Sequence, residues 1–138
     1  MKPVLLISAS LLVKLVMTDC DPEMAALYNM TLTTHWTPEN YPKQYPTWRP
    51  PAQWSPVFGF SHAKDHPLYQ VGSVADDGVA SFVETGNTET LLQNLDMETV
   101  LDIITGPAVK SGEGTTQTSV FVDGLHSKVC ITIRIGFN

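Results

Sequence analysis

The sequence is poor in basic residues, and this shortage excludes one class of partner. Eight Lys and Arg stand against 14 Asp and Glu, which gives a formal net charge of −6 in 138 residues. The Lys and Arg residues form no run anywhere in the chain. A phosphate backbone would be repelled, because binding to it requires clustered positive charge. We therefore expect no nucleic-acid partner.

The chain also lacks an apolar run long enough to span a bilayer, which takes roughly 20 residues. The apolar stretch Val4–Val13 (VLLISASLLV) follows Lys2 and is closed by Lys14. A short apolar segment behind a positive start is typical of a signal peptide. We expect residues 1–18 to be a signal peptide and residues 19–138 to be the mature domain, without a transmembrane segment. The alternative is an N-terminal strand or helix of the core.

Cysteine is scarce as well, since Cys20 and Cys130 are the only two in the chain. One disulfide between them is compatible with an oxidising compartment and would stabilise the fold by ~4–5 kcal/mol, because it closes a loop of about a hundred residues. Two separate thiols fit the sequence equally well. Asn29 begins an N-glycosylation triplet, Asn29-Met30-Thr31, which agrees with export.

Alternation of apolar and polar residues predicts strands at both ends of the chain. The expected strands are 25–35, 119–123 and 128–135, and the apolar segment 57–62 is expected to be a short strand or a turn. In the first strand, Asn29 falls on the solvent face, and in the last, Cys130 falls on the polar face. Three- and four-residue spacing of leucines predicts a helix over 88–104, after a shorter one over 78–84.

This arrangement predicts a mainly β protein, an antiparallel β-sandwich with short helical insertions in one domain. The segment 111–116 (SGEGTT) is expected to be a flexible loop. No internal repeat is evident.

Proline and aromatic residues are concentrated in one segment. Seven of the ten prolines fall between Thr37 and Pro67, and neither a helix nor a central strand can run through such a segment. The same region holds large aromatic rings: Trp36, Tyr41, Tyr45, Trp48 and Trp54. A disordered linker rarely carries so many aromatics. We expect an ordered loop held on the domain by ring burial, with an exposed carbohydrate-stacking platform as the alternative.

Two groups of residues have side chains that could form a catalytic or a metal site. Asp123, His126 and Cys130 resemble a Cys/His hydrolase site in composition, but a histidine in a turn and a thiol on an edge strand explain them more simply. His62, Asp65 and His66 have the residue types of a zinc or copper site. Pro67 makes a helix at this position doubtful, and an ordinary loop is the better interpretation. We expect no catalytic residues and no cofactor-binding residues.

Several segments resemble the spondin-domain family, and are most similar to its mindin branch. The clearest is residues 41–55 (YPKQYPTWRPPAQWS). Other segments match the family and occur in the same order as in its members: residues 31–36 (TLTTHW), 59–62 (GFSH), 112–119 (GEGTTQTS) and 126–127 (HS). The resemblance covers about residues 20 to 135, and a fifteen-residue match rich in Trp, Tyr and Pro is rare by chance.

The resemblance implies a C2-like β-sandwich that works outside the cell. It also implies a calcium ion held by carboxylates from separated strands and loops, one of which matches Asp123. Family members continue beyond the last strand into a segment that supplies further ligands and the cysteine that pairs with the one matching Cys20. We expect this chain to be truncated at its C-terminus, so that Asp123 is a remnant ligand, because calcium prefers six to eight oxygen ligands.

The function that this resemblance implies is a secreted, non-catalytic binding module of the extracellular matrix, in cell adhesion or innate recognition. Its expected partners are cell-surface receptors such as integrins, and matrix or microbial surface glycans. A structural matrix component that self-associates through an exposed sheet edge is the alternative. A Cys/His hydrolase is a second, weaker alternative.

Overall fold

The computed structural model describes residues 21–43, 45–47, 51–65 and 67–136. Strands predominate in it. The strands are β1 (Ala26–His35), β2 (Gln53–Trp54), β3 (Val57–His62), β4 (Val100–Gly106), β5 (Glu113–Val122), β6 (Lys128–Thr132) and β7 (Ile135–Gly136). The helices are α1 (Asp77–Thr85) and α2 (Glu89–Asn94).

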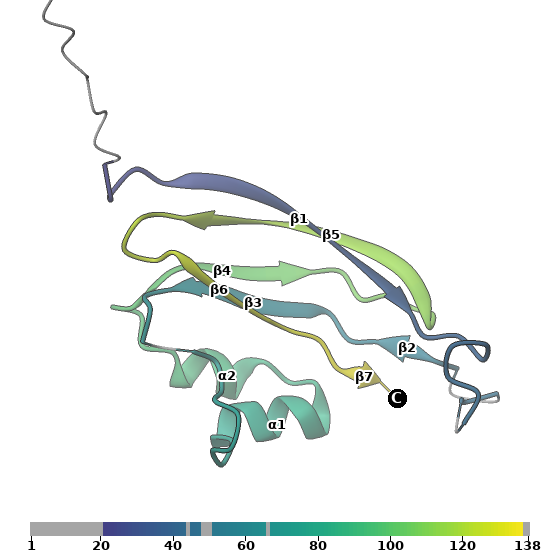
Figure 1. Ribbon diagram of the computed structural model, residues 1–138. Coiled ribbons are helices and arrows are strands. Elements are labelled where there is room, and N and C mark those ends of the chain that lie inside the picture. The colour runs from purple at the N-terminus through teal and green to yellow at the C-terminus, as the bar shows by residue number, and fades with distance from the viewer. Residues whose placement is uncertain (1–20, 44, 48–50, 66, 137–138) are drawn as a thin grey trace, which may run out of the picture.

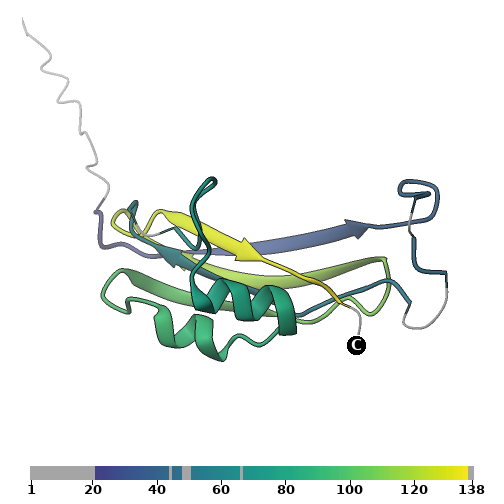
Figure 2. The ribbon, with the colours of Figure 1, turned by 90° about the horizontal axis from the view of Figure 1, so that it is seen from below.

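The elements form three layers (Figure 1). The long antiparallel pair β1–β5 is the first layer, and the antiparallel sheet with strand order β4-β3-β6 is the second. The helices α1 and α2 lie on the far side of the second sheet, as Figure 2 also shows. The short pair β2–β7 lies at the end of the molecule where the chain stops. The predicted mainly β, antiparallel sandwich with helical insertions is confirmed.

Strand β3 is central, because all six of its residues are buried. Phe58 and Phe60 point toward the helices and form the core with Phe82 and Leu91, all of them at most 2% exposed. The alternate residues, including Val57 and Ser61, point toward the β1–β5 layer, since successive side chains of a strand face opposite sides. A strand that is covered on both sides explains the apolar run that the sequence shows here.

Local signals fix the ends of helix α1. The carboxylate of Asp76 accepts a hydrogen bond from the backbone N–H of Val79 at 2.8 Å, which is an N-cap. Gly86 ends the helix with φ of 77°, a left-handed conformation that glycine adopts without strain. Arg134 then donates to the carbonyls of Val83 and Glu84 at 2.7 and 2.9 Å. This side chain ties the last turn of α1 to the β6–β7 segment.

The strand prediction for 25–35 is confirmed by β1, the expected strand or turn at 57–62 is the strand β3, and the helix prediction for 78–84 is confirmed by α1. The helix predicted over 88–104 is wrong in its second half, where the chain turns at Asp96–Thr99 and continues as β4. The carboxylate of Asp96 accepts the N–H of Glu98 in this turn. The β-branched residues that follow favour a strand.

Two other boundaries differ from the sequence predictions. The segment 111–116 is not a loop throughout, because β5 begins at Glu113 and its register pairs Glu113 with His35. The last predicted strand, 128–135, is two strands, and its second part pairs with β2 instead of β3. Both differences come from pairing with distant strands, which local alternation does not encode.

The proline-rich segment packs onto the end of the sandwich, as predicted. The ring of Trp36 meets Tyr45 and Trp54 edge to face, with centroids 5.7 and 5.8 Å apart. Trp48 and Arg49 lie outside the described residues. Within the described part, neither helix is long and apolar enough to cross a membrane.

Candidate functional site

An aromatic groove of about 570 Å³ opens between the end of β1 and the β6–β7 segment. Its floor and walls include Leu32, Trp36, Trp54, Ile133 and Ile135. The side chains of Tyr41, Lys43 and His35 also line it. We call this feature the aromatic groove.

The tryptophans of the aromatic groove are fixed by backbone groups of a distant segment. Trp54 Nε1 donates to the carbonyl of Gly112 at 3.0 Å, and the same carbonyl accepts the backbone N–H of Trp36 at 3.1 Å. A Cβ at position 112 would lie 2.1 Å from the carbonyl oxygen of Trp36, so only glycine allows this approach. The walls are therefore rigid.

Tyr41 differs from the tryptophans because it is 55% exposed. Trp36 and Trp54 are half-buried, between the buried and the exposed arrangement that the sequence left open. An exposed phenol beside half-buried rings and a lysine offers apolar stacking together with polar contacts. Sites that bind small groups commonly combine a mostly apolar lining with a few polar groups.

Asp123 lies in the turn between β5 and β6, next to His126. Its Oδ1 accepts the backbone N–H of Leu125 at 2.8 Å and that of His126 at 2.6 Å. The His126 ring nitrogen Nδ1 lies 3.0 Å from the same oxygen. The backbone N–H of His126, together with the other hydrogen bonds of the turn and against a smaller effect of burial, lowers the pKa of Asp123. This carboxylate holds the hairpin.

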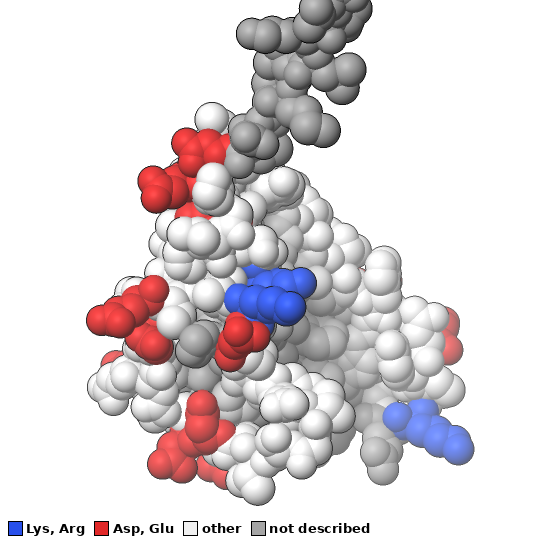
Figure 3. Space-filling view, turned by 60° about the vertical axis from the view of Figure 1, so that its left-hand side comes forward, with Lys and Arg blue, Asp and Glu red and all other residues white. Residues whose placement is uncertain are grey.

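The donor set around Asp123 does not suit a calcium ion. Its Oδ1 already accepts from three nitrogens of the turn. Among the described residues, no three His, Cys, Asp or Glu side chains lie close enough to hold a metal ion together. Figure 3 shows acidic side chains in several separate groups, without a common centre.

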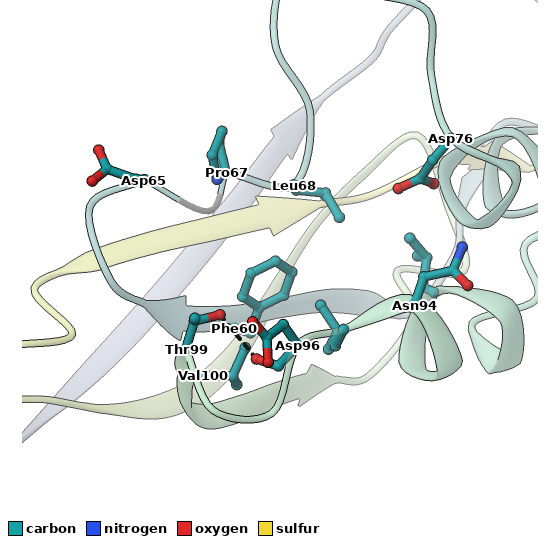
Figure 4. A pocket seen from close by; sticks show the side chains of 11 residues that line it. Phe60, Asp65, Pro67, Leu68, Asp76, Asn94, Asp96, Thr99 and Val100 are labelled. Atoms are coloured by element: carbon teal, nitrogen blue, oxygen red, sulfur yellow. Dashed lines mark hydrogen bonds between the residues drawn. The ribbon is translucent and has the colours of Figure 1, made fainter.

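A smaller cavity of about 250 Å³ lies beside Phe60, between β3 and the helices (Figure 4). Asp65, Asp76 and Asp96 line it, but their carboxylates do not converge on one point. Asp76 caps α1, and Asp96 holds the turn before β4. Of the three residues considered for a zinc or copper site, His62 is not in a loop but ends strand β3, Asp65 lies in the turn that follows, and His66 lies outside the described residues. The carboxylates of Asp76 and Asp96 are thus engaged in a helix cap and a turn.

Cys130 corrects one prediction, because it does not face solvent with the polar residues of its strand. It packs against the helix-covered core. Its Sγ lies 3.0 Å from Nε2 of His62 and accepts the N–H of Leu68 at 3.4 Å. The helices and the loop before them cover this face of β6, which makes the inward position favourable. The histidine beside the thiol is therefore His62, whereas His126 lies beside Asp123.

Sequence reasoning missed the pairing of His62 with Cys130. In the β3–β6 register, Phe60 is opposite Cys130 and His62 is opposite Lys128, so His62 and Cys130 are diagonal neighbours on one face. The alternation of both strands was visible in the sequence, but the register between them was not. Cys20 lies outside the described residues, so the Cys20–Cys130 disulfide stays a prediction.

Asn29 is exposed on β1, opposite Ser119 of β5. Together with Met30, Thr31 and Ser119 it borders a shallow polar hollow. Attachment of a glycan at this position stays a prediction.

Comparison with known proteins adds the family. The family model described as Spondin_N matches residues 26–137. Spondin-2 of Homo sapiens is 33% identical over 121 residues, which cover 84% of this chain and 37% of that protein. Spondin-2 of Rattus norvegicus matches to the same extent. Spondin-1 of Homo sapiens is 35% identical over 69 residues, half of this chain and 8% of that protein. The chain thus spans little more than a third of the length of the Spondin-2 proteins that it matches.

Proposed function

Because this chain belongs to the spondin N-terminal domain family, we propose that it is a secreted, non-catalytic binding module of the extracellular matrix, in cell adhesion or innate recognition. The observation that carries the proposal is the family match over residues 26–137, which includes the whole proline- and aromatic-rich segment between Thr37 and Pro67. Its partners are cell-surface receptors such as integrins, and matrix or microbial surface glycans.

We place the binding face at the aromatic groove. Tyr41 is accessible there, while Trp36 and Trp54 hold the groove open from beneath. Stacking of a ring against a sugar face or an apolar side chain requires this combination of exposure and rigid support. Among the described residues that line the groove, Lys43 is the one permanently charged side chain, so shape and stacking provide most of the recognition.

The test compares binding of the purified, secreted chain to integrin-bearing cells and to bacterial surfaces. The decisive variant is Tyr41→Ala, and the matched control is Tyr69→Ala, because Tyr69 is 63% exposed but does not line the groove. We expect wild type and Tyr69→Ala to bind equally and Tyr41→Ala to bind at least about tenfold more weakly, as for a contact at the centre of an interface. Equal binding by all three proteins would refute this location. No binding of the wild type to either surface would refute the function.

Secretion and glycosylation belong to the same proposal. We expect the chain to enter the medium of a eukaryotic host and to carry a glycan on Asn29, whose exposed position on β1 would accept one without disturbing the core. Treatment with an endoglycosidase should increase the electrophoretic mobility of the wild type. The variant Asn29→Gln should already migrate at the faster position.

Calcium enters the proposal only through Asp123. We propose that this 138-residue chain by itself does not bind calcium with useful affinity, because its carboxylate is committed to the β5–β6 turn. Extracellular calcium modules are saturated at a calcium concentration of about 5 mM. The melting temperature in about 5 mM calcium chloride should therefore equal the melting temperature in the presence of a chelator. A clear rise of the melting temperature in calcium, lost in Asp123→Asn, would contradict this.

Absence of catalysis is a further part of the proposal. The three residues of the candidate hydrolase site are divided between two contacts: Asp123 contacts His126, whereas Cys130 contacts His62. We expect no hydrolysis of ester or peptide substrates above the rate of the Cys130→Ala and His126→Ala variants. An activity that either substitution abolishes would support an enzyme instead.

A second candidate is a self-associating matrix component. Within the described residues, β1 pairs only with β5, and β6 pairs only with β3, so each leaves one edge without a neighbour. Apolar side chains near these edges are exposed, including Leu27 at 55% and Ile131 at 41%. Open edges with apolar side chains favour pairing between chains. Sedimentation velocity over a hundredfold range of protein concentration tests this candidate. A self-associating component should form larger species as the concentration rises, and Ile131→Lys should abolish this association.

A further inference from the structure

We infer that Cys130 is a thiol–disulfide exchange site in which His62 accepts the thiol proton. The inference does not depend on the partners proposed above, and it concerns a residue pair that the binding function does not use. Three observations support the inference: the orientation of the His62 ring, the distance from this ring to the sulfur, and a second hydrogen-bond donor to the sulfur.

The tautomer of His62 follows from its backbone contact. Nδ1 of the ring lies 2.6 Å from the carbonyl oxygen of Ala63. A carbonyl oxygen only accepts hydrogen bonds, so Nδ1 carries the hydrogen and the neutral ring presents a lone pair at Nε2. The ring is 3% exposed and packs edge to face on Phe60, with centroids 5.4 Å apart. It is therefore held in one orientation.

The lone pair at Nε2 faces Cys130. The distance from Nε2 to Sγ is 3.0 Å, which is within reach of a hydrogen bond from the thiol. A nucleophile beside a base, with the base oriented by a third group, is the arrangement that activates side-chain nucleophiles. Here the third group is the carbonyl of Ala63. Transfer of the proton from Sγ to Nε2 leaves a thiolate.

The backbone supplies a second donor to that thiolate. The N–H of Leu68 points at Sγ from 3.4 Å, within range for a hydrogen bond to sulfur. Donors of this kind stabilise the negative charge, and thiolates rather than thiols attack disulfides. Cys130 is partly exposed, and β6 lies at the edge of the three-stranded sheet among the described residues. A disulfide reagent would approach the sulfur from this edge of the sheet, beside the loop that carries Leu68.

The reaction balances with a disulfide as the only co-reactant. The Cys130 thiolate attacks one sulfur of the disulfide, and a new S–S bond forms between them. The original S–S bond breaks, and the other half leaves as a thiolate, which takes up the proton held by His62. Cys130 is oxidised and the departing half is reduced. The event occurs once per chain, so it is a modification and not a catalytic cycle.

The test uses the full chain with Cys20→Ala, so that Cys130 is the only thiol, and oxidised glutathione as the disulfide. The rate of glutathionylation is followed by intact-mass spectrometry at neutral pH, in the native state and in urea. We expect the native protein to react at least about tenfold faster than the unfolded chain. A native rate equal to or below the unfolded rate would overturn the inference, and this comparison needs no substitution at His62.

A pair of variants then isolates the base. His62→Gln, in the same background, keeps a hydrogen-bonding side chain but removes the base, and it should lower the native rate about tenfold or more. His126→Gln is the matched control, because His126 contacts Asp123 and lies apart from the thiol. It should leave the rate unchanged. A folded His62→Gln variant that reacts as fast as the His126→Gln variant would overturn the role of His62.

Discussion

The two faces of the central sheet β4-β3-β6 are built from different side chains. Toward the helices, Phe58 and Phe60 meet Phe82 and Leu91 in a core with almost no exposure. Toward β1–β5, strand β3 presents Val57 and Ser61. On the neighbouring strand β6, the residues that face this side are Val129 and Ile131, which are 40% and 41% exposed. The core on the helix-covered face is therefore aromatic. The opposite face is closely covered over β3 and β4, where Val57 and Ile104 are both 1% exposed, and open over β6. The aromatic groove opens on that side, between β1 and the β6–β7 segment.

The strongest way to break this comparison is to delete a ring on the helix-covered face. Phe60→Ala should lower the free energy of unfolding by about 3–5 kcal/mol, because it leaves a cavity in a packed core. Leu32→Ala, on the groove side and only half-buried, should lower it by about 1 kcal/mol. Urea denaturation of the two variants measures both values. Equal losses would show that the two faces contribute alike.

A second variant tests what holds the helices against the sheet. Arg134→Ala removes the two hydrogen bonds to the carbonyls of Val83 and Glu84, and it should lower the free energy of unfolding by about 1–2 kcal/mol. The control is Lys110→Ala, since Lys110 is an exposed cation that lines the same surface hollow. Its effect should stay within about 0.5 kcal/mol. If Arg134→Ala left the free energy of unfolding unchanged, packing alone would position α1.

Acid titration tests the hairpin that joins β5 to β6. The turn lowers the pKa of Asp123 in the folded protein, so its charged form stabilises the fold above the unfolded value of about 3.9. That contribution is lost as the pH falls through the lowered folded value. Asp123→Asn should therefore show a smaller drop of melting temperature than the wild type between about pH 6 and about pH 2.5, a range that includes the unfolded value. Asp65→Asn, in an exposed loop, should melt like the wild type throughout.

The smallest effect is expected at Ser61, on the face toward β1–β5. Its hydroxyl is fully buried and has no hydrogen-bond partner among the described residues. Burial of an unpaired hydroxyl costs free energy, so Ser61→Ala should be neutral or stabilising by up to about 1 kcal/mol. Thermal melts of the two proteins give the difference. Destabilisation by more than this amount would mean that the hydroxyl stabilises the fold.

Much of the fold could be predicted from local sequence. The alternation that predicts β1 and the apolar residues at the start of β3 are both local features of the sequence, and both predictions are confirmed. The short helix predicted over 78–84 is confirmed by α1 as well. The helix predicted through Ile104 failed, because leucine spacing of three and four occurs there on both sides of a turn. The start of β5 at Glu113 failed because its pairing with His35 bridges more than half of the chain.

The candidate site could be predicted only in part. The concentration of Trp, Tyr and Pro marked the loop, and its rings do pack on the domain. The sequence did not reveal that the carbonyl of Gly112 fixes two of those tryptophans. It likewise placed Asp123 beside His126 by proximity in the chain, but assigned Cys130 to the wrong face of its strand.

The sequence by itself determined the family, the strand-rich class and the residue types available for binding, because periodicity, composition and motifs are local properties. Tertiary structure alone decided which side chains meet. A shift of one residue between β3 and β6 would turn Cys130 away from His62, since successive side chains point to opposite faces. The register between strands is set by packing against the helices and by the loops that join them, and these act only in the folded chain.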